Sequence, residues 1–222
     1  MVDDKFDRKE LQHDPFRDVA FEFIHFVYEQ RRWFIGGGIA LFAIVALVAG
    51  GLAYQRHAER EESEALLQAT RTMRNTSTTP EAKWTAGTKA FQAFVAEYPR
   101  SALAPVAWLY LARIAWEQKE LDRSAQAFQH VLDHRKVTPL LRTEALVGLG
   151  KIKEAQGKPA EAKAHYEQIG EGFQDLKQLS LGRAALAAGD LQAAREHFLQ
   201  AAGAQGYTGV TIQAREALDF LP

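Results

Sequence analysis

The C-terminal two thirds of the chain repeat themselves, and this internal repeat constrains the fold more than any other sequence feature. Each unit opens with a leucine and a small residue, reaches a polar turn seven residues later, and then places a small, an aromatic and an apolar residue at fixed offsets. The opening leucines are Leu111, Leu149 and Leu181, so the units recur at spacings of 38 and 32 residues. A fixed period of this length is typical of stacked helical repeats.

The spacing predicts a helix–turn–helix unit. The small residues allow the first helix, A, to lie close to the second helix, B, and we expect the aromatic residue of B to wedge into the next unit. One hairpin cannot bury its apolar face alone, so the units must stack into a solenoid. A degenerate unit precedes them, with an A helix ending near Asn75 and a B helix that begins at the N-cap Thr79 and Pro80. A last helix, Val210 to Phe220, would cap the stack.

These units resemble tetratricopeptide repeats, whose pattern has Leu-Gly, a Gly-Asp turn, then alanine, an aromatic and an apolar residue. The resemblance covers residues 84–202, and the units beginning at Leu149 and Leu181 match best. Ala112 replaces the usual glycine and Ser124 the usual alanine. The resemblance implies an α-solenoid whose A helices line a concave groove that binds proteins.

An uncharged run of 22 residues, Trp33 to Tyr54, precedes the repeats. As a helix it would span about 33 Å, enough for a hydrocarbon core of about 30 Å. We therefore predict a transmembrane helix that acts as an uncleaved signal anchor. The chain has no cysteine, which excludes disulfides, thiolate metal sites and a lipoprotein anchor. Two pairs of small residues at four-residue spacing could form a packing seam in this helix: Gly36 with Ala40, and Ala46 with Gly50.

The sequence thus predicts an all-α chain in four parts: a disordered cytoplasmic tail (1–14), a juxtamembrane amphipathic helix (15–32), the transmembrane helix (33–54) and a tetratricopeptide-repeat domain with its capping helix (55–222). The amphipathic helix could lie in the membrane interface, dock on a protein, or simply extend the span. Arginines flank the span almost evenly. The Arg31-Arg32 pair favours a cytoplasmic N-terminus, which would place the repeats in the periplasm.

This order of parts resembles the ancillary SecYEG translocon subunit family (YfgM-like proteins). That resemblance implies a bacterial inner-membrane protein that associates with the translocon and with periplasmic chaperones, serving as an interaction scaffold in contact with the lipid bilayer. The alternative is a structural or assembly subunit of a respiratory, division or envelope complex, whose contacts are made mainly by residues 15–54. A homo-oligomer remains open under either interpretation.

No catalytic, cofactor or metal site is expected. The net charge of −1 gives no reason to expect nucleic-acid binding. His130 and His134 are four apart, a spacing that suits a metal pair, but the sequence offers no third ligand. It also has no G-x-S-x-G motif, and its run of three glycines, Gly36-Gly37-Gly38, lies inside the predicted span rather than in a phosphate-binding loop. We expect a binding protein rather than an enzyme.

A basic residue follows the Leu-small pair in all three units: Arg113, Lys151 and Arg183. This position lies on the inner face of helix A, so the three would form a basic ladder along the groove. Nearby groove positions are Leu109, Trp116, Glu154 and Leu186. Basic groups among apolar contacts suit an acidic or carboxylate-ended peptide. Alternatively, these are ordinary solvent-facing helix residues.

Overall fold

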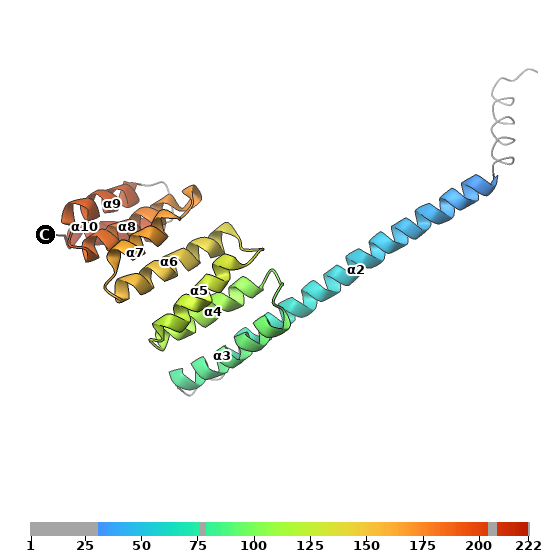
Figure 1. Cartoon of the computed structure of the whole chain (residues 1–222), viewed down its shortest axis with the longest axis horizontal. Helices are drawn as coiled ribbons and strands as arrows, with labels where there is room; N and C mark the ends of the chain where they lie inside the picture. The colour runs from blue at the N-terminus through green and yellow to red at the C-terminus, as the bar shows by residue number, and fades with distance from the viewer. Residues whose placement is uncertain (1–30, 76–78, 204–207, 222) are drawn as a thin grey trace, which may run out of the picture. The chain divides into compact units, whose positions relative to one another are not determined.

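The computed structural model describes residues 31–75, 79–203 and 208–221, with the side chains of 31–40, 43 and 208 left out. All regular structure in these ranges is helical, which confirms the all-α prediction for them. The elements are α2 (Arg31–Asn75), α3 (Pro80–Glu97), α4 (Ala104–Glu117), α5 (Leu121–Asp133), α6 (Pro139–Ala155), α7 (Pro159–Glu167), a 3-10 turn η2 (Glu171–Phe173), α8 (Gln174–Ala187), α9 (Leu191–Gly203) and α10 (Thr208–Asp219) (Figure 1).

The chain divides into two compact units, Met1–Glu59 and Arg60–Pro222. In the first unit, the predicted tail 1–14 and residues 15–30 of the predicted amphipathic helix lie outside the described residues. The rest belongs to α2, and its described apolar side chains are exposed, for example Phe42 and Leu47. None of the helices in the described residues has a stretch long and apolar enough to cross a membrane. The side chains of 33–40 and 43, within the predicted span, are outside the described part.

The predicted small-residue seam also falls partly outside the described part, because Gly36 and Ala40 have no described side-chain surroundings. Ala46 and Gly50 are exposed, and a Cβ atom added to Gly50 would meet no atom within 4 Å. The seam therefore stays a prediction.

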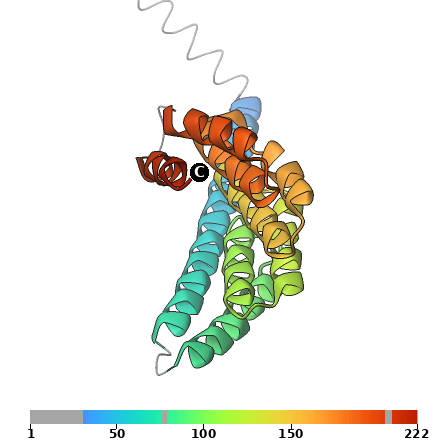
Figure 2. The same cartoon turned by 90° about the vertical axis from the view of Figure 1, so that its left-hand side faces the viewer.

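The second unit is a stack of antiparallel hairpins. Its helices pair as the C-terminal part of α2 with α3, α4 with α5, α6 with α7, and α8 with α9, and α10 packs on α9 (Figures 1 and 2). Three apolar cores run along it in order: one from α2 to α6, one from α6 to α8 and one from α8 to α10. This succession of local cores is what a solenoid of stacked units requires.

The degenerate first hairpin forms as its sequence predicts. The hydroxyl of Thr79 accepts a hydrogen bond from the Ala82 amide at 3.2 Å, and Pro80 occupies the first turn of α3. Gly87 lets α3 approach α2, because a Cβ atom there would lie 2.8 Å from Cγ of Met73. The capping helix forms as well, as α10, and it buries Ala214 completely.

The repeat aromatics lie against glycines and also belong to cores that extend into the next unit. Tyr166 lies against Gly150 of its own hairpin and shares a core with Leu181 and Ala184 of α8, and Phe198 lies against Gly182 and shares a core with Ala214 of α10. Phe128 also reaches the next hairpin, where it lies against Gly148 of α6.

Ser124, the other departure from the repeat pattern, is fully buried where the later units have alanine. Its hydroxyl donates a hydrogen bond to the Ala112 carbonyl oxygen at 2.8 Å. The bond links α5 to α4 across the hairpin, and it satisfies a polar group that would be costly to bury alone.

The turn inside each of the three later hairpins places one residue in the left-handed region, with φ of 61° at Lys119, 73° at Gly157 and 81° at Gly189. Glycine adopts this conformation freely, whereas a residue with a side chain is strained in it by about 1–2 kcal/mol.

Lys119→Gly should therefore stabilise the protein by about 0.5–1 kcal/mol. The relief of strain is partly offset by the greater conformational freedom of glycine in the unfolded chain. Urea unfolding measures this, and Gly189→Ala should shift the midpoint the other way. A destabilised Lys119→Gly variant would contradict the strain argument.

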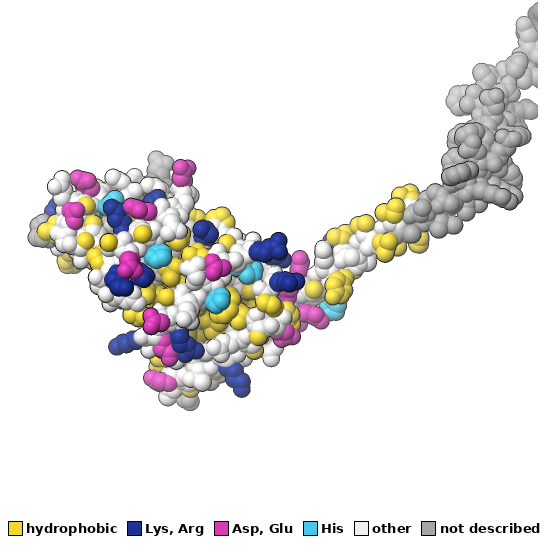
Figure 3. Space-filling model, viewed as in Figure 1, with side chains coloured by type: hydrophobic (Ala, Val, Ile, Leu, Met, Phe, Trp, Pro, Cys, Tyr) yellow, Lys and Arg dark blue, Asp and Glu magenta, His cyan; other side chains and the backbone are white. Residues whose placement is uncertain are grey.

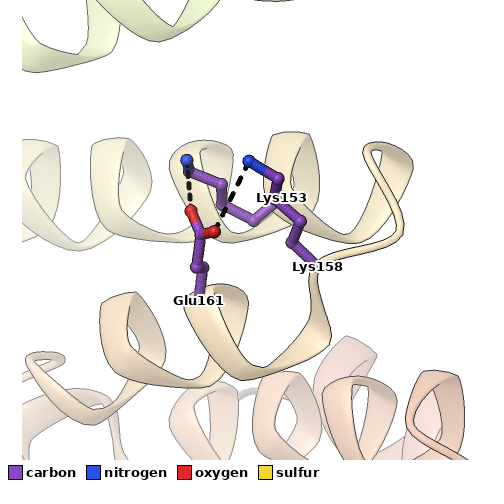
Figure 4. A network of polar contacts seen from close by, with 3 residues as sticks. All are labelled: Lys153, Lys158 and Glu161. Atoms are coloured by element: carbon purple, nitrogen blue, oxygen red, sulfur yellow. Dashed lines mark hydrogen bonds and ion pairs between the residues drawn. The ribbon is translucent and has the colours of Figure 1, made fainter.

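Ion pairs also link helices of one hairpin. Figure 4 shows the Glu161 carboxylate of α7 between Lys153 of α6 and Lys158, at 2.6 and 3.5 Å. The hydrogen bond from Lys153 is the main cause of a lowered pKa at Glu161. The pair is solvated, so its contribution is to orientation more than to stability.

Candidate functional site

The three ladder residues occupy equivalent places on three successive A helices, Arg113 on α4, Lys151 on α6 and Arg183 on α8. In each case the preceding Leu-small pair is buried in the core, whereas the basic residue is exposed or half-exposed. One residue further along a helix turns the side chain by about 100°, which moves it from the core to the surface. The ladder position therefore follows directly from the register of the repeat.

Two of the three basic residues have a partner on the A helix of the following unit. The Arg113 guanidinium pairs with the Glu144 carboxylate of α6. Arg183 Nη2 donates to Oε1 of Gln213 on α10 at 3.0 Å. Lys151 has no hydrogen bond or ion pair within the described part of the chain.

Lys151 is the electrostatic centre of the ladder. Although the residue remains accessible to solvent, partial desolvation is the main cause of a lowered pKa at its ammonium group. The charges of Arg183 and Arg113 lower this pKa further, whereas Glu154 and Glu144 oppose the shift. The structure thus brings all three ladder residues within electrostatic range of one another, and the central cation is incompletely compensated.

A pocket of about 160 Å³ opens beside Lys151, between α4 and α6. Trp116 is half-buried there and presents apolar surface next to the charges. The lining residues are Arg113, Trp116, Phe128, Glu144, Val147, Gly148 and Lys151. This combination of cations, one carboxylate and an aromatic wall could hold a short apolar side chain beside an anionic group.

The other predicted groove residues behave differently. Leu109 is only 5% exposed and belongs to the first core, so its assignment to the groove was wrong. It lies four residues before Arg113, and the offset of about 40° around the helix is enough to turn its side chain into the core. Glu154 accepts a hydrogen bond from the Tyr166 hydroxyl at 2.9 Å. Burial first, and then this carboxylate, raise the pKa of Tyr166 above its usual range. Leu186 is 42% exposed and available for contact.

The histidines have individual structural roles. His130 stacks on Trp108 with ring centroids 4.2 Å apart, whereas His134 lies beyond the end of α5, so the two do not share a helical face. His197 Nδ1 is 2.7 Å from Oε1 of Gln178, and burial lowers the pKa of both His165 and His197. In the described ranges, no three His, Cys, Asp or Glu side chains come together in a way that could hold a metal ion.

Sequence reasoning missed Glu144 and Gln213, which contact the ladder. Glu144 precedes Lys151 by seven residues, two helical turns, so the same helix face carries both. That signal was available in the sequence. The contact from Arg183 to Gln213 was not, because residues 204–207, between α9 and α10, lie in no recognisable repeat register.

Residues 31–218 match the tetratricopeptide repeat-like domain. The chain belongs to this family. No curated protein gives a significant match. Tetratricopeptide repeat-like domains generally mediate protein–protein interactions, and the stacked hairpins described above have the architecture of such a domain.

Proposed function

We propose that this tetratricopeptide repeat-like domain binds an acidic or carboxylate-ended segment of a partner protein. The segment would lie in the groove along Arg113, Lys151 and Arg183, which we call the ladder groove. The observation that carries the proposal is Lys151: an ammonium group held between two guanidinium groups, with no direct ion pair or hydrogen bond within the described residues. A ligand carboxylate at this point would accept a charge-assisted hydrogen bond and reduce the repulsion along the ladder.

The apolar part of the groove adds a second contact. Trp116 and Val147 line the pocket beside Lys151, so a short apolar side chain next to the ligand carboxylate could be buried there. Arg113 is engaged by Glu144, and it would need to exchange this partner to contact the ligand. Lys151 is therefore the primary anion contact, with Arg183 as the second.

We further propose that the chain is a membrane-tethered scaffold of the bacterial inner membrane, ancillary to protein translocation or to the recruitment of periplasmic chaperones. The hydropathy of Trp33–Tyr54 supports the tether, and the Arg31-Arg32 pair supports a cytoplasmic N-terminus with periplasmic repeats. The resemblance to ancillary translocon subunits supports the choice of complex. In this role the protein binds and positions its partners and does not act on them as an enzyme.

The alternative is a structural or assembly subunit, in which residues 15–54 make the contacts with the other subunits and the repeats make none. The exposed apolar side chains of α2 between Leu41 and Leu52 are compatible with such an assembly subunit. The two roles differ in which part of the chain is needed for partner binding.

Site-specific photo-crosslinking separates the two roles. A photoreactive residue at Arg183 in the full chain should yield one discrete protein adduct in intact cells, and the same residue at Lys163 of α7, away from the ladder, should not. Purification in mild detergent then identifies the partner. Only diffuse background at Arg183, with the complex recovered equally well after deletion of residues 60–222, would refute the groove and support the assembly role.

A further inference from the structure

A hollow lies between α3, α4 and α5, on the side of α4 that faces away from the ladder. Its volume is about 190 Å³, and it shares no lining residue with the pocket beside Lys151. On α4 it is lined by Leu111 and Ala115, which lie about 160–200° around the helix from Arg113. Figure 3 shows hydrophobic side chains, in yellow, in a hollow over these helices. We call it the outer groove, and it is separate from the ladder groove.

The floor of the outer groove is apolar, whereas its walls carry carboxamide groups. Three buried residues of the α4–α5 hairpin form the floor: Leu111, Ala115 and Ala127. Each of the three helices also contributes one glutamine to the lining: Gln92 in α3, Gln118 at the end of α4 and Gln126 in α5. The side chains of these glutamines make no hydrogen bond within the described part of the chain. Three carboxamides are thus available to one ligand.

The lining of the outer groove has no net charge. Its one acid and its one base, Glu120 and Arg123, form an ion pair with each other. Helices α3 and α4 each contain as many acids as bases, and α5 contains one acid in excess. At the other end of the groove His130 stacks on Trp108, with ring centroids 4.2 Å apart. A charged ligand would therefore gain little here from long-range attraction.

Comparison with the next hairpin shows why the groove is open. Ala115 corresponds to Lys153, and Arg123 to Glu161, because the two units are 38 residues apart. The Lys153 ammonium group lies 2.6 Å from the Glu161 carboxylate and so bridges α6 to α7 at the equivalent place (Figure 4). The methyl group of Ala115 is too short to make such a bridge to α5. The open groove is therefore set by the residues of this hairpin rather than by the repeat fold itself.

The dimensions and the chemistry of the groove suit an extended peptide. From Trp108 to Gln118 the groove follows α4 for ten residues, or about 15 Å. About four residues of extended chain cover this length. A carboxamide offers both donors and an acceptor, as a peptide group offers one of each, so the glutamines can bond to the backbone of such a segment. The hollow above the apolar floor has room for one apolar side chain.

We propose that the outer groove binds an uncharged, extended segment of a partner protein, through hydrogen bonds from its glutamines to the backbone and through one apolar side chain over Leu111 and Ala115. This site goes beyond the ladder groove and gives the domain a second protein-binding face with a different preference. A neutral oligosaccharide fits less well. Trp108 is half-buried against the first core and carries His130 on one face, so little aromatic surface remains on which a sugar ring could stack.

Peptide selection on the full chain, purified in mild detergent, tests the proposal. The probe is a phage-displayed library of decapeptides built from uncharged residues only. Ala115→Lys with Arg123→Glu copies the Lys153–Glu161 pair of the next hairpin into the groove and fills it, and its circular dichroism spectrum should match that of the unaltered chain. The selected peptides should share an apolar position and bind this filled variant about tenfold or more weakly, the contribution of one buried apolar side chain.

Single changes test the carboxamides separately from the floor. Gln118→Leu should weaken binding of the selected peptides by about three- to tenfold, the loss of one hydrogen bond. Gln156→Leu, at the equivalent position of the next hairpin, is the matched control and should leave binding unchanged. Lys151→Met, in the ladder groove, should also leave it unchanged.

Several outcomes would overturn the outer groove as a peptide site. One is a set of peptides that bind the filled variant equally well or lose affinity with Lys151→Met, and another is a library that yields no binder. Binding of chitohexaose to the unaltered chain but not to the filled variant, without any peptide binder, would show a sugar site instead. These outcomes leave the acidic ligand of the ladder groove untouched, so the two proposals fail independently.

Discussion

Gly150→Ala is expected to lower the free energy of unfolding by about 1–3 kcal/mol, the typical cost of overpacking a core. A Cβ atom at this position would overlap the ring of Tyr166, which is buried between α6 and α7. The ring cannot move outward freely, because its hydroxyl is bonded to Glu154. The better helix propensity of alanine offsets only about 1 kcal/mol. Chemical denaturation followed by circular dichroism measures the loss.

Gly172→Ala is the matched control, because a Cβ atom at that position would meet no atom within 4 Å. The stability of the protein should barely change in this variant. A double-mutant cycle locates the cause. In a Tyr166→Leu background, Gly150→Ala should cost much less, since the smaller side chain leaves room for the methyl group. An unchanged cost in that background would show that the ring contact does not explain the effect.

Lys151→Met is expected to weaken binding of an acidic, carboxylate-ended peptide by about 10- to 100-fold, since a hydrogen bond to a charged group contributes about 1.5–3 kcal/mol. The same change should stabilise the free protein. The pKa of Lys151 is lower in the folded than in the unfolded state, so its protonated form opposes folding. This cost is fully present below the lowered pKa and disappears as the pH rises from that pKa toward the ordinary value of 10.5.

Calorimetric titration of the peptide tests the loss of binding, and thermal unfolding at pH 7 and at pH 10 tests the gain in stability. The stability advantage of Lys151→Met should shrink at the higher pH. Lys163→Met on α7 removes the same charge away from the ladder and should change neither quantity appreciably. Loss of binding without a gain in stability would show that Lys151 is already compensated in the free protein.

Much of the fold follows from local sequence signals. The Leu-small pairs, the turns and the aromatic positions predict each hairpin, and Thr79-Pro80 predicts the start of α3, because these depend on residues close in the chain. The ladder position follows from the same register. Contacts between hairpins are harder to predict. The contact of Phe128 with Gly148 of α6 is an example, because Gly148 lies outside the repeat pattern.

The groove was predicted less completely than the fold for the same reason. Arg183 meets Gln213 across a connection with no repeat register, and Leu109 faces the core although it lies near Arg113 along the helix. The basic ladder can be predicted from equivalent positions in the repeat. The residue that pairs with each cation, however, belongs to the next hairpin or to the capping helix.

The ring of Phe128 has a consequence for the order in which the domain opens. In a linear array, cooperativity is carried by the interfaces between neighbours. Phe128 joins the hairpin of α4 and α5 to α6, and the largest core extends over α2 to α6, whereas the other two cores extend only over α6 to α8 and over α8 to α10. The domain should therefore open from its C-terminal end. Amide hydrogens of α9 and α10 should exchange with solvent by local opening, while those of α4 and α5 exchange only on global unfolding.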